Sequence, residues 1–320
     1  MCYIKLYLIV FLIVFFVQLY FILSYFYKFS KKYLFTNEIN LTEKYGTNTW
    51  VIVTGCSSGQ GELICYEFAK RNFNIILMGY KGIKKVEKII NDNFKNIKTI
   101  RCVTNFCKAY KKNYFKKIES ILDNLDGELS FLVNNIGHRT AWYPYHEMPE
   151  QKINDTIVCG TIVQSRLTQI AIKHFENRKN KEYKSGIINI TSMCMHTSTF
   201  FGMMNYISIP YLSVYEASNA FGFYHSNSIQ KEYEKTIDIL NITPGAVITS
   251  NTPYLKNVWF SINSDQYVKN IFKLIGNYTG PQCSYWKHEI SSILYPFVDS
   301  DNILLQVGKL ISNEYMSLIK

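Results

Sequence analysis

The stretch TGCSSGQG, residues 54–61, decides the fold of this chain. It follows the apolar run WVIV at residues 50–53 and precedes a helical pattern. A buried strand that turns through three glycines into a helix is typical of a pyrophosphate site. Gly55 permits the tight turn, and Gly59 lets backbone N–H groups approach the phosphates. Gly61 lets the helix pack closely on the strand, with the helix N-terminus facing the anion.

Strand-like and helix-like segments alternate along the chain from this stretch onward. The patterns predict strands at residues 50–53, 74–78, 97–103, 130–133, 186–190 and 236–242, and helices at 60–71, 82–94, 114–125, 152–175 and 212–233. Such alternation predicts an α/β fold, a doubly wound parallel sheet with helices on both faces. Right-handed crossovers then place the ligand at the carboxyl ends of the strands. Beyond about residue 250 the pattern becomes irregular and aromatic, which is typical of a segment that covers a substrate.

The N-terminus predicts a membrane anchor. Residues 6–27 are almost continuously apolar, and as a helix they extend about 33 Å, enough to cross a bilayer core. Lys28, Lys31 and Lys32 follow, against only Lys5 before, and this bias places the main domain in the cytosol. A cleaved signal peptide is the alternative, although its apolar region should be shorter and no small-residue cleavage site is visible. The expected organisation is an anchor at 1–27, a basic connector at 28–48, a core at 49–250, and a substrate-covering, membrane-proximal segment at 251–320.

The amino-acid composition and net charge limit the kinds of ligand and partner that the chain can bind. The 320 residues are 48% hydrophobic, so a full core is expected, and the net charge of +11 suits a phosphorylated dinucleotide, an acyl-CoA or an anionic membrane surface. The lysines are scattered and no nucleic-acid motif is present, which argues against a nucleic-acid partner. Eight cysteines without a CxxC pair or regular spacing indicate neither a metal site nor a disulfide framework.

Four further motifs follow in order. They are NNIG at 134–137 and INITS at 188–192, each at the end of a predicted strand, then PYLSVYEASNA at 210–220 and TPGAVIT at 243–249. With the glycine-rich turn, they make residues 50–250 resemble the short-chain dehydrogenase/reductase superfamily, which implies a Rossmann-type fold. The chain is similar to its membrane-anchored branch of 17β-hydroxysteroid dehydrogenases and very-long-chain 3-oxoacyl-CoA reductases. The cues for this branch are the N-terminal anchor, LVNNIG at 132–137, Tyr143-Pro144 and the segment 209–220.

The resemblance assigns roles residue by residue. Tyr215 would give a proton to the substrate carbonyl, and Ser192 would polarise that carbonyl. The cofactor residues it implies are Gly55, Ser57, Gly59, Gln60 and Gly61 at the phosphates, Asn105 facing the adenine where the family usually has an aspartate, Asn134 and Gly137 on the adenosine side, and Pro244, Val247 and Thr249 at the nicotinamide amide. It also implies residence in the endoplasmic reticulum membrane and a possible homodimer.

The turn after the second strand bears on the cofactor. An acidic residue there would bind the ribose 2′-hydroxyl of NAD, but residues 78–82, MGYKG, contain none. Lys81, Lys84 and Lys85 could pair with a 2′-phosphate, or they could form a solvated basic helix face. The sequence therefore favours NADP(H).

Three departures from the family pattern stand out. The family lysine four residues after the tyrosine is Asn219 here. Its amide can still form hydrogen bonds, but the positive charge of lysine is lost. The helix asparagine of the family's proton relay aligns with Gly160, although Asn154 could substitute if the helix shifts. Residues 193–206 form an insertion beside the site and include His196, which could supply a proton or be an ordinary solvated side chain.

Two hypotheses remain. The first is an NADP(H)-dependent ketone reductase acting on a lipid, and the resemblance implies 3-oxoacyl-CoA reduction in fatty-acid elongation or 17β-hydroxysteroid-type oxidoreduction. The second is a degenerate member of the fold that binds NADP(H) or a lipid-enzyme partner without turnover. A purely structural membrane scaffold is disfavoured by the intact glycine-rich turn.

Overall fold

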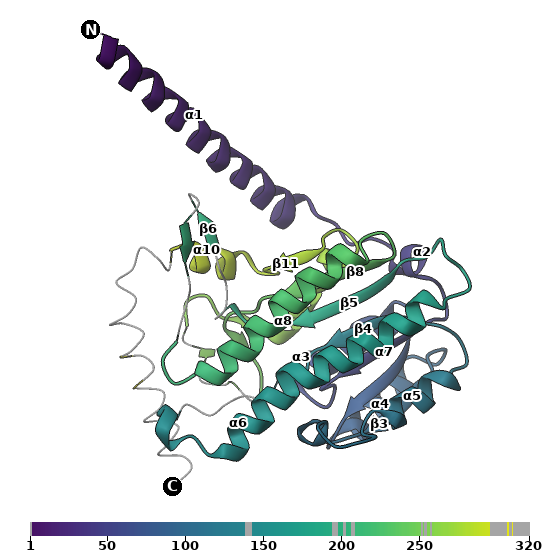
Figure 1. Ribbon diagram of the computed structural model, residues 1–320. Helices are drawn as coiled ribbons and strands as arrows, with labels where there is room; N and C mark the ends of the chain where they lie inside the picture. The colour runs from purple at the N-terminus through teal and green to yellow at the C-terminus, as the bar shows by residue number, and fades with distance from the viewer. Residues whose placement is uncertain are drawn as a thin grey trace.

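A seven-stranded parallel sheet forms the centre of the molecule (Figure 1). The computed structural model describes residues 2–137, 143–193, 198–200, 203–205, 209–250, 252, 255–256, 258–294, 306 and 309. The strand order is β3-β2-β1-β4-β5-β8-β11, so the topology reverses between β1 and β4. The strands are β1 (Trp50–Thr54), β2 (Asn74–Gly79), β3 (Thr99–Val103), β4 (Leu129–Asn134), β5 (Ser185–Ile190), β8 (Ile237–Ile242) and β11 (Gly280–Gln282). This confirms the predicted doubly wound fold.

Helices cover both faces of the sheet. One apolar cluster holds α3 (Gly59–Lys70), α4 (Ile83–Asn93) and α9 (Ser264–Leu274). The other cluster includes side chains of α5 (Lys116–Asp123), of the end of α8 (Ser213–Glu232) and of a long continuous helix. That helix consists of α6 (Glu150–Ile157), the π-helical segment η4 (Val158–Val163) and α7 (Gln164–Glu176). The alternation of side chains along β1 decides which cluster each residue joins: Val51 and Val53 enter the first, Trp50 and Ile52 the second. Two short 3₁₀ turns, η2 (Phe106–Lys108) and η3 (Tyr145–Glu147), lie in the loops.

The region after residue 250 is more regular than its sequence pattern predicts. It contains α9, the edge strand β11 paired with β8, the strand β10 (Ile262–Asn263), which pairs with β9 (Val247–Ile248) before it, and α10 (Trp286–Leu294). The three-residue β11 carries Gly280 and Pro281, so its sequence gives no strand signal, and only pairing with Leu240 to Ile242 makes it a strand. The insertion at 193–206 includes an antiparallel hairpin of β6 (Ser198–Phe200) and β7 (Met203–Asn205), which lies beside α10 (Figure 1).

The N-terminal helix projects away from the sheet (Figure 1). α1 (Cys2–Ser30) continues into a π-helical turn, η1 (Lys31–Phe35), and residues 3–35 are long and apolar enough to span a membrane. The segment 28–48, predicted as a basic connector, contributes two side chains to the core. Within it, α2 (Leu41–Tyr45) buries both of its terminal side chains, and the Tyr45 hydroxyl donates to Asp238 Oδ2 at 2.9 Å.

Candidate active site

The glycine-rich turn has the backbone geometry that its sequence predicts. Gly55 and Gly59 adopt left-handed φ angles of +66° and +62°, which residues other than glycine rarely adopt. A Cβ at Gly61 would collide with the Gly55 carbonyl oxygen, so only glycine lets α3 start this close to β1. The turn therefore leaves backbone N–H groups and the α3 N-terminus facing the carboxyl edge of the sheet, where an anion can bind. Ser57 belongs to the same turn, and Gln60 is the second residue of α3.

The end of β4 is braced against β1 by side chains. Asn135 Nδ2 donates to the Thr54 carbonyl at 3.0 Å, and the Asn135 N–H donates to Thr54 Oγ1 at 2.9 Å. Asn134 is buried, and its amide donates to Asn189 Oδ1 at 2.8 Å and to Thr168 Oγ1 at 3.2 Å. Among the described residues Asn134 Oδ1 has no hydrogen-bond partner. Asn134 thus connects β4 to β5 and α7 at the point where the topology reverses, and Gly137 follows three residues on.

Ser192 follows the end of β5 and is buried. Backbone hydrogen bonds fix it on both sides, since the Thr191 N–H donates to the Ile242 carbonyl and the Met193 N–H to the Pro244 carbonyl, each at 2.9 Å. Ser192 therefore lies against the loop 243–249, which sequence reasoning assigned to the nicotinamide.

Tyr215 is half-buried in the first turn of α8. Its carbonyl oxygen accepts hydrogen bonds from Ser218 Oγ at 2.7 Å and from Asn219 Nδ2 at 2.8 Å. The Asn219 amide thus bonds to its own helix, one turn back. Asparagine is too short to do what the family lysine does from this position, because lysine carries its charge on a flexible four-carbon stem.

Gly160 lies in the π-helical segment η4, packed directly on α8. A Cβ at this position would lie 2.8 Å from Ser218 Cβ and 2.9 Å from Ser218 Oγ. Ser218, the residue before Asn219, therefore occupies the space that a side chain at Gly160 would need. Asn154 lies in α6, one and a half turns before Gly160.

The loop 243–249 is held from three sides. The Gly245 N–H donates to His288 Nδ1 at 3.2 Å, Thr243 Oγ1 lies 3.2 Å from Cys283 Sγ, and the Thr249 N–H donates to Thr252 Oγ1 at 2.8 Å. On its open side, a Cβ at Gly59 would contact Thr249 Cγ2 at 3.6 Å. The loop carrying Pro244, Val247 and Thr249 therefore faces the glycine-rich turn across the carboxyl edge of the sheet.

His288 is a residue of this site that sequence reasoning missed. Its side chain is fully buried, and the rings of Tyr285, Tyr267 and Phe260 surround it with centroids 5.0 to 6.2 Å away. Burial lowers the pKa of His288 to about 4, so the imidazole is neutral and Nδ1 is free to accept from Gly245. It lies 43 residues beyond Gly245 in a stretch without regular pattern, and no local motif connects the two.

Asn105 follows β3, and the lysines predicted to pair with a 2′-phosphate follow β2. Asn105 Oδ1 accepts from the Cys107 N–H at 3.1 Å, so this side chain caps the short helix η2. Lys81, Lys84 and Lys85 are exposed around Gly82 after β2, and Lys85 Nζ lies 3.7 Å from Glu62 Oε1. His196 falls outside the described residues.

The pattern of the short chain dehydrogenase family matches residues 49–257, which include every motif at this edge. The chain belongs to that family. It is 30% identical to human 17-beta-hydroxysteroid dehydrogenase type 3 over 247 residues, which cover 75% of this chain and 72% of that protein. It is 24% identical to the very-long-chain 3-oxoacyl-CoA reductase of Aspergillus niger over 251 residues, 75% of this chain and 67% of that protein.

Solved structures support the fold. A 7beta-hydroxysteroid dehydrogenase superimposes with a TM-score of 0.67 at 16% identity, covering 85% of this chain and 100% of its own. A short-chain dehydrogenase from Sphingobium yanoikuyae, solved in complex with NADPH, superimposes with a TM-score of 0.61 at 17% identity over 78% of this chain and 96% of its own.

Proposed function

We propose that this protein is an NADP(H)-dependent reductase that converts a ketone of a lipid substrate to an alcohol. One observation carries the proposal. The neighbours of Ser192 are held by backbone hydrogen bonds, Met193 to Pro244 in the loop 243–249 and Thr191 to Ile242 just before it. Thr249 of that loop lies next to the glycine-rich turn, with its Cγ2 3.6 Å from the position that a Cβ at Gly59 would occupy. The residues that we assign to the carbonyl, the nicotinamide and the phosphates therefore lie along one edge of the sheet, the place where ligands bind in open α/β folds.

The residues of this edge fit a nicotinamide dinucleotide. The left-handed glycines leave room for a pyrophosphate against the backbone, with Gly55, Ser57, Gly59, Gln60 and Gly61 as its contacts. The exposed Lys81, Lys84 and Lys85 favour a 2′-phosphate, since the turn between β2 and α4 has no acid to bind a 2′-hydroxyl. When bound, NADP(H) supplies the hydride.

The side chains of this chain supply the rest of the reaction. In our proposal the Ser192 hydroxyl donates a hydrogen bond to the ketone oxygen and polarises it. The Tyr215 hydroxyl gives its proton to the same oxygen as the carbon is reduced. Pro244, Val247 and Thr249 hold the nicotinamide amide, and Asn134 and Gly137 support the adenosine side together with Asn105.

Relatives and charge guide the choice of substrate. The relatives bear the names of steroid dehydrogenases and 3-oxoacyl-CoA reductases. The net charge of +11 favours a polyanionic 3-oxoacyl-CoA over a neutral steroid. We place the protein in the endoplasmic reticulum membrane, anchored by its N-terminal helix with the catalytic domain in the cytosol, and as a possible homodimer.

A second candidate is a member of the fold that binds NADP(H) without turnover. It is favoured by the contact of Gly160 with Ser218 and by the Asn219 amide, which bonds to its own helix. In that case the cofactor or a lipid-enzyme partner is bound, and the Tyr215 proton is not transferred.

The experiment is NADPH oxidation by the full chain in phospholipid vesicles, with a long-chain 3-oxoacyl-CoA and a 17-ketosteroid as substrates. We expect the acyl-CoA to be reduced, with the 3-hydroxyacyl-CoA identified by mass spectrometry. Turnover of the steroid alone would reassign the substrate. NADPH binding without oxidation of either compound would favour the second candidate.

A further inference from the structure

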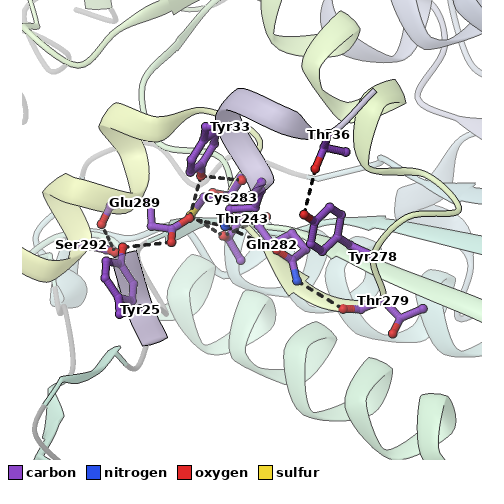
Figure 2. Close-up of polar contacts among 11 residues, drawn as sticks. Tyr25, Tyr33, Thr36, Thr243, Tyr278, Thr279, Gln282, Cys283, Glu289 and Ser292 are labelled. Atoms are coloured by element: carbon purple, nitrogen blue, oxygen red, sulfur yellow. Dashed lines mark hydrogen bonds and ion pairs between the residues drawn. The ribbon is translucent and has the colours of Figure 1, made fainter. Parts of the chain in front are cut away.

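Hydrogen bonds and an ion pair connect helix α10 to the end of the N-terminal helix (Figure 2). Glu289 accepts from the Tyr33 hydroxyl at 2.6 Å and from the Tyr25 hydroxyl at 3.0 Å, and it forms an ion pair with Lys32. Tyr25 belongs to the apolar run that would cross the bilayer. If this run spans a membrane, Glu289 therefore holds α10 at the depth where the helix leaves the hydrocarbon layer.

The two sides of α10 differ in character. His288 and Ser292, four residues apart, are buried against the protein. Trp286 and Leu294, on another side, are 43% and 50% exposed, and Ile290 between them is half-buried. This outer face is apolar along the whole length of the helix.

A second exposed tryptophan extends this face. Trp259 is 58% exposed, and Lys287 Nζ lies 5.9 Å from its ring and 5.7 Å from the ring of Trp286. The same ammonium donates to the Trp259 carbonyl at 3.2 Å, which ties the two segments together. Tryptophan rings beside a lysine are the composition that membrane–water interfaces favour.

We propose that this surface, made of Trp259, Trp286, Lys287, Ile290 and Leu294, lies in the headgroup region of the bilayer that the N-terminal helix spans. The inference rests on the proposed anchor and not on the proposed reaction. Its occupant is lipid because the contact between Tyr25 and Glu289 places α10 at the end of the apolar run. A helix with one apolar face and one face on the protein suits burial in the interface plane.

The proposed lipid-facing surface and the candidate active site lie on opposite sides of α10. His288, on the inner side of this helix, accepts from Gly245 in the loop 243–249, and the hairpin of β6 and β7 lies alongside (Figure 1). The docking therefore places the hairpin of β6 and β7 beside the membrane-facing helix and the loop 243–249 directly behind it, where an acyl chain leaving the bilayer would enter.

The test is quenching of tryptophan emission by brominated lipid acyl chains. The full chain carries Trp142→Phe, which leaves Trp50, buried in the core, with Trp259 and Trp286. In vesicles of brominated phosphatidylcholine we expect emission to fall relative to unbrominated vesicles. The fall should be lost in the further double variant Trp259→Phe/Trp286→Phe, which retains only Trp50.

A control places a tryptophan at the opposite edge of the sheet. Tyr110 is exposed after β3, whereas α10 follows β11. In the double variant, Tyr110→Trp should give emission that brominated lipid does not quench. Equal quenching of this control, or no quenching of Trp259 and Trp286, would overturn the proposal. Shielding of both tryptophans by a second copy in detergent, without lipid quenching, would overturn it as well.

Alkaline extraction separates this proposal from the anchor on which it rests. A chain released from vesicles at high pH would overturn both. A chain that stays in the membrane but shows unquenched tryptophans would overturn the docking alone. NADPH oxidation is measured separately, so neither result bears on the proposed reaction.

Discussion

Asn219 is the residue that most limits the proposed chemistry. Its amide bonds to the Tyr215 carbonyl, so it contributes to the geometry of α8 and brings no positive charge to the site. A cation near a proton donor stabilises the anion that the donor becomes, and general acid catalysis is typically worth about 10²–10⁴-fold in rate. If the protein turns over its substrate, it does so without this contribution.

Asn219→Lys should therefore raise kcat, by up to about 10²-fold, because it restores a positive charge one turn from Tyr215. The measurement is steady-state NADPH oxidation with saturating substrate. Asn219→Met is the control, since it has a similar length and no charge. Equal rates in the two variants would show that charge at this position does not limit the reaction.

Glu216, the neighbour of Tyr215, gives a prediction about stability. Burial raises the pKa of Glu216 to about 7, while its Oε1 accepts from the Ile209 N–H at 2.6 Å. The folded state thus resists ionisation of a group that ionises near about 4.3 when unfolded. Its contribution to stability is complete below that value and is lost as the pH rises to 7.

Glu216→Gln keeps an acceptor for Ile209 and removes the titration. We expect it to raise the unfolding temperature in detergent at pH 8 and to leave it nearly unchanged at pH 4.5. Thermal unfolding at the two pH values measures this difference. A variant that is less stable than the parent at pH 8 would show that the ionised carboxylate is accommodated.

At the scale of elements, the contact of η4 with α8 leaves no room for a side chain at Gly160, the position that we align with the relay asparagine. A side chain at Gly160 would have to displace Ser218 or push the two helices apart. Overpacking of this kind typically costs about 1–3 kcal/mol.

Gly160→Asn should lower the free energy of unfolding by about 1–3 kcal/mol and should not raise the rate of NADPH oxidation. Adding Ser218→Gly removes the clashing atoms and should recover most of that stability. Chemical denaturation of the single and double variants makes the comparison. Gly160→Asn without loss of stability would mean that α8 can move away from η4 at little cost.

The elements also show what the sequence could and could not predict. The glycine-rich turn was predictable because local backbone geometry requires Gly55, Gly59 and Gly61 whatever the rest of the chain does. Ser192 and Tyr215 were found at strand and helix ends by their motifs. β11 and His288 were not, because each depends on a partner far away in the sequence, Leu240 to Ile242 for the strand and Gly245 for the imidazole.

At the scale of the whole molecule, the N-terminal helix is part of the folded structure. Its end contacts Glu289, and Thr36 Oγ1 lies 2.9 Å from Tyr278 Oη (Figure 2). Further along the chain, Lys44 donates to the Gly276 carbonyl at 2.8 Å. These contacts run along the segment that carries β11 and α10. A helix joined to the domain in this way has a fixed orientation relative to it, which a flexible linker would not give.

Glu289→Gln should weaken this junction, because it leaves Lys32 without its ion-pair partner in a largely buried place. We expect the free energy of unfolding in detergent to fall by about 1–3 kcal/mol. Asp126→Asn, which removes the exposed ion pair with Lys98, is the matched control and should have little effect. Equal effects of the two substitutions would mean that the junction adds nothing to stability.

The most direct test of the account compares the parent chain with Tyr215→Phe in phospholipid vesicles. NADPH binding is followed by fluorescence, and NADPH oxidation is followed with a long-chain 3-oxoacyl-CoA. We predict that both proteins bind NADPH equally and that Tyr215→Phe loses turnover by about 10²-fold or more. Equal rates in the two proteins, or binding by the parent without any oxidation, would contradict the claim that Tyr215 is the proton donor of a reductase.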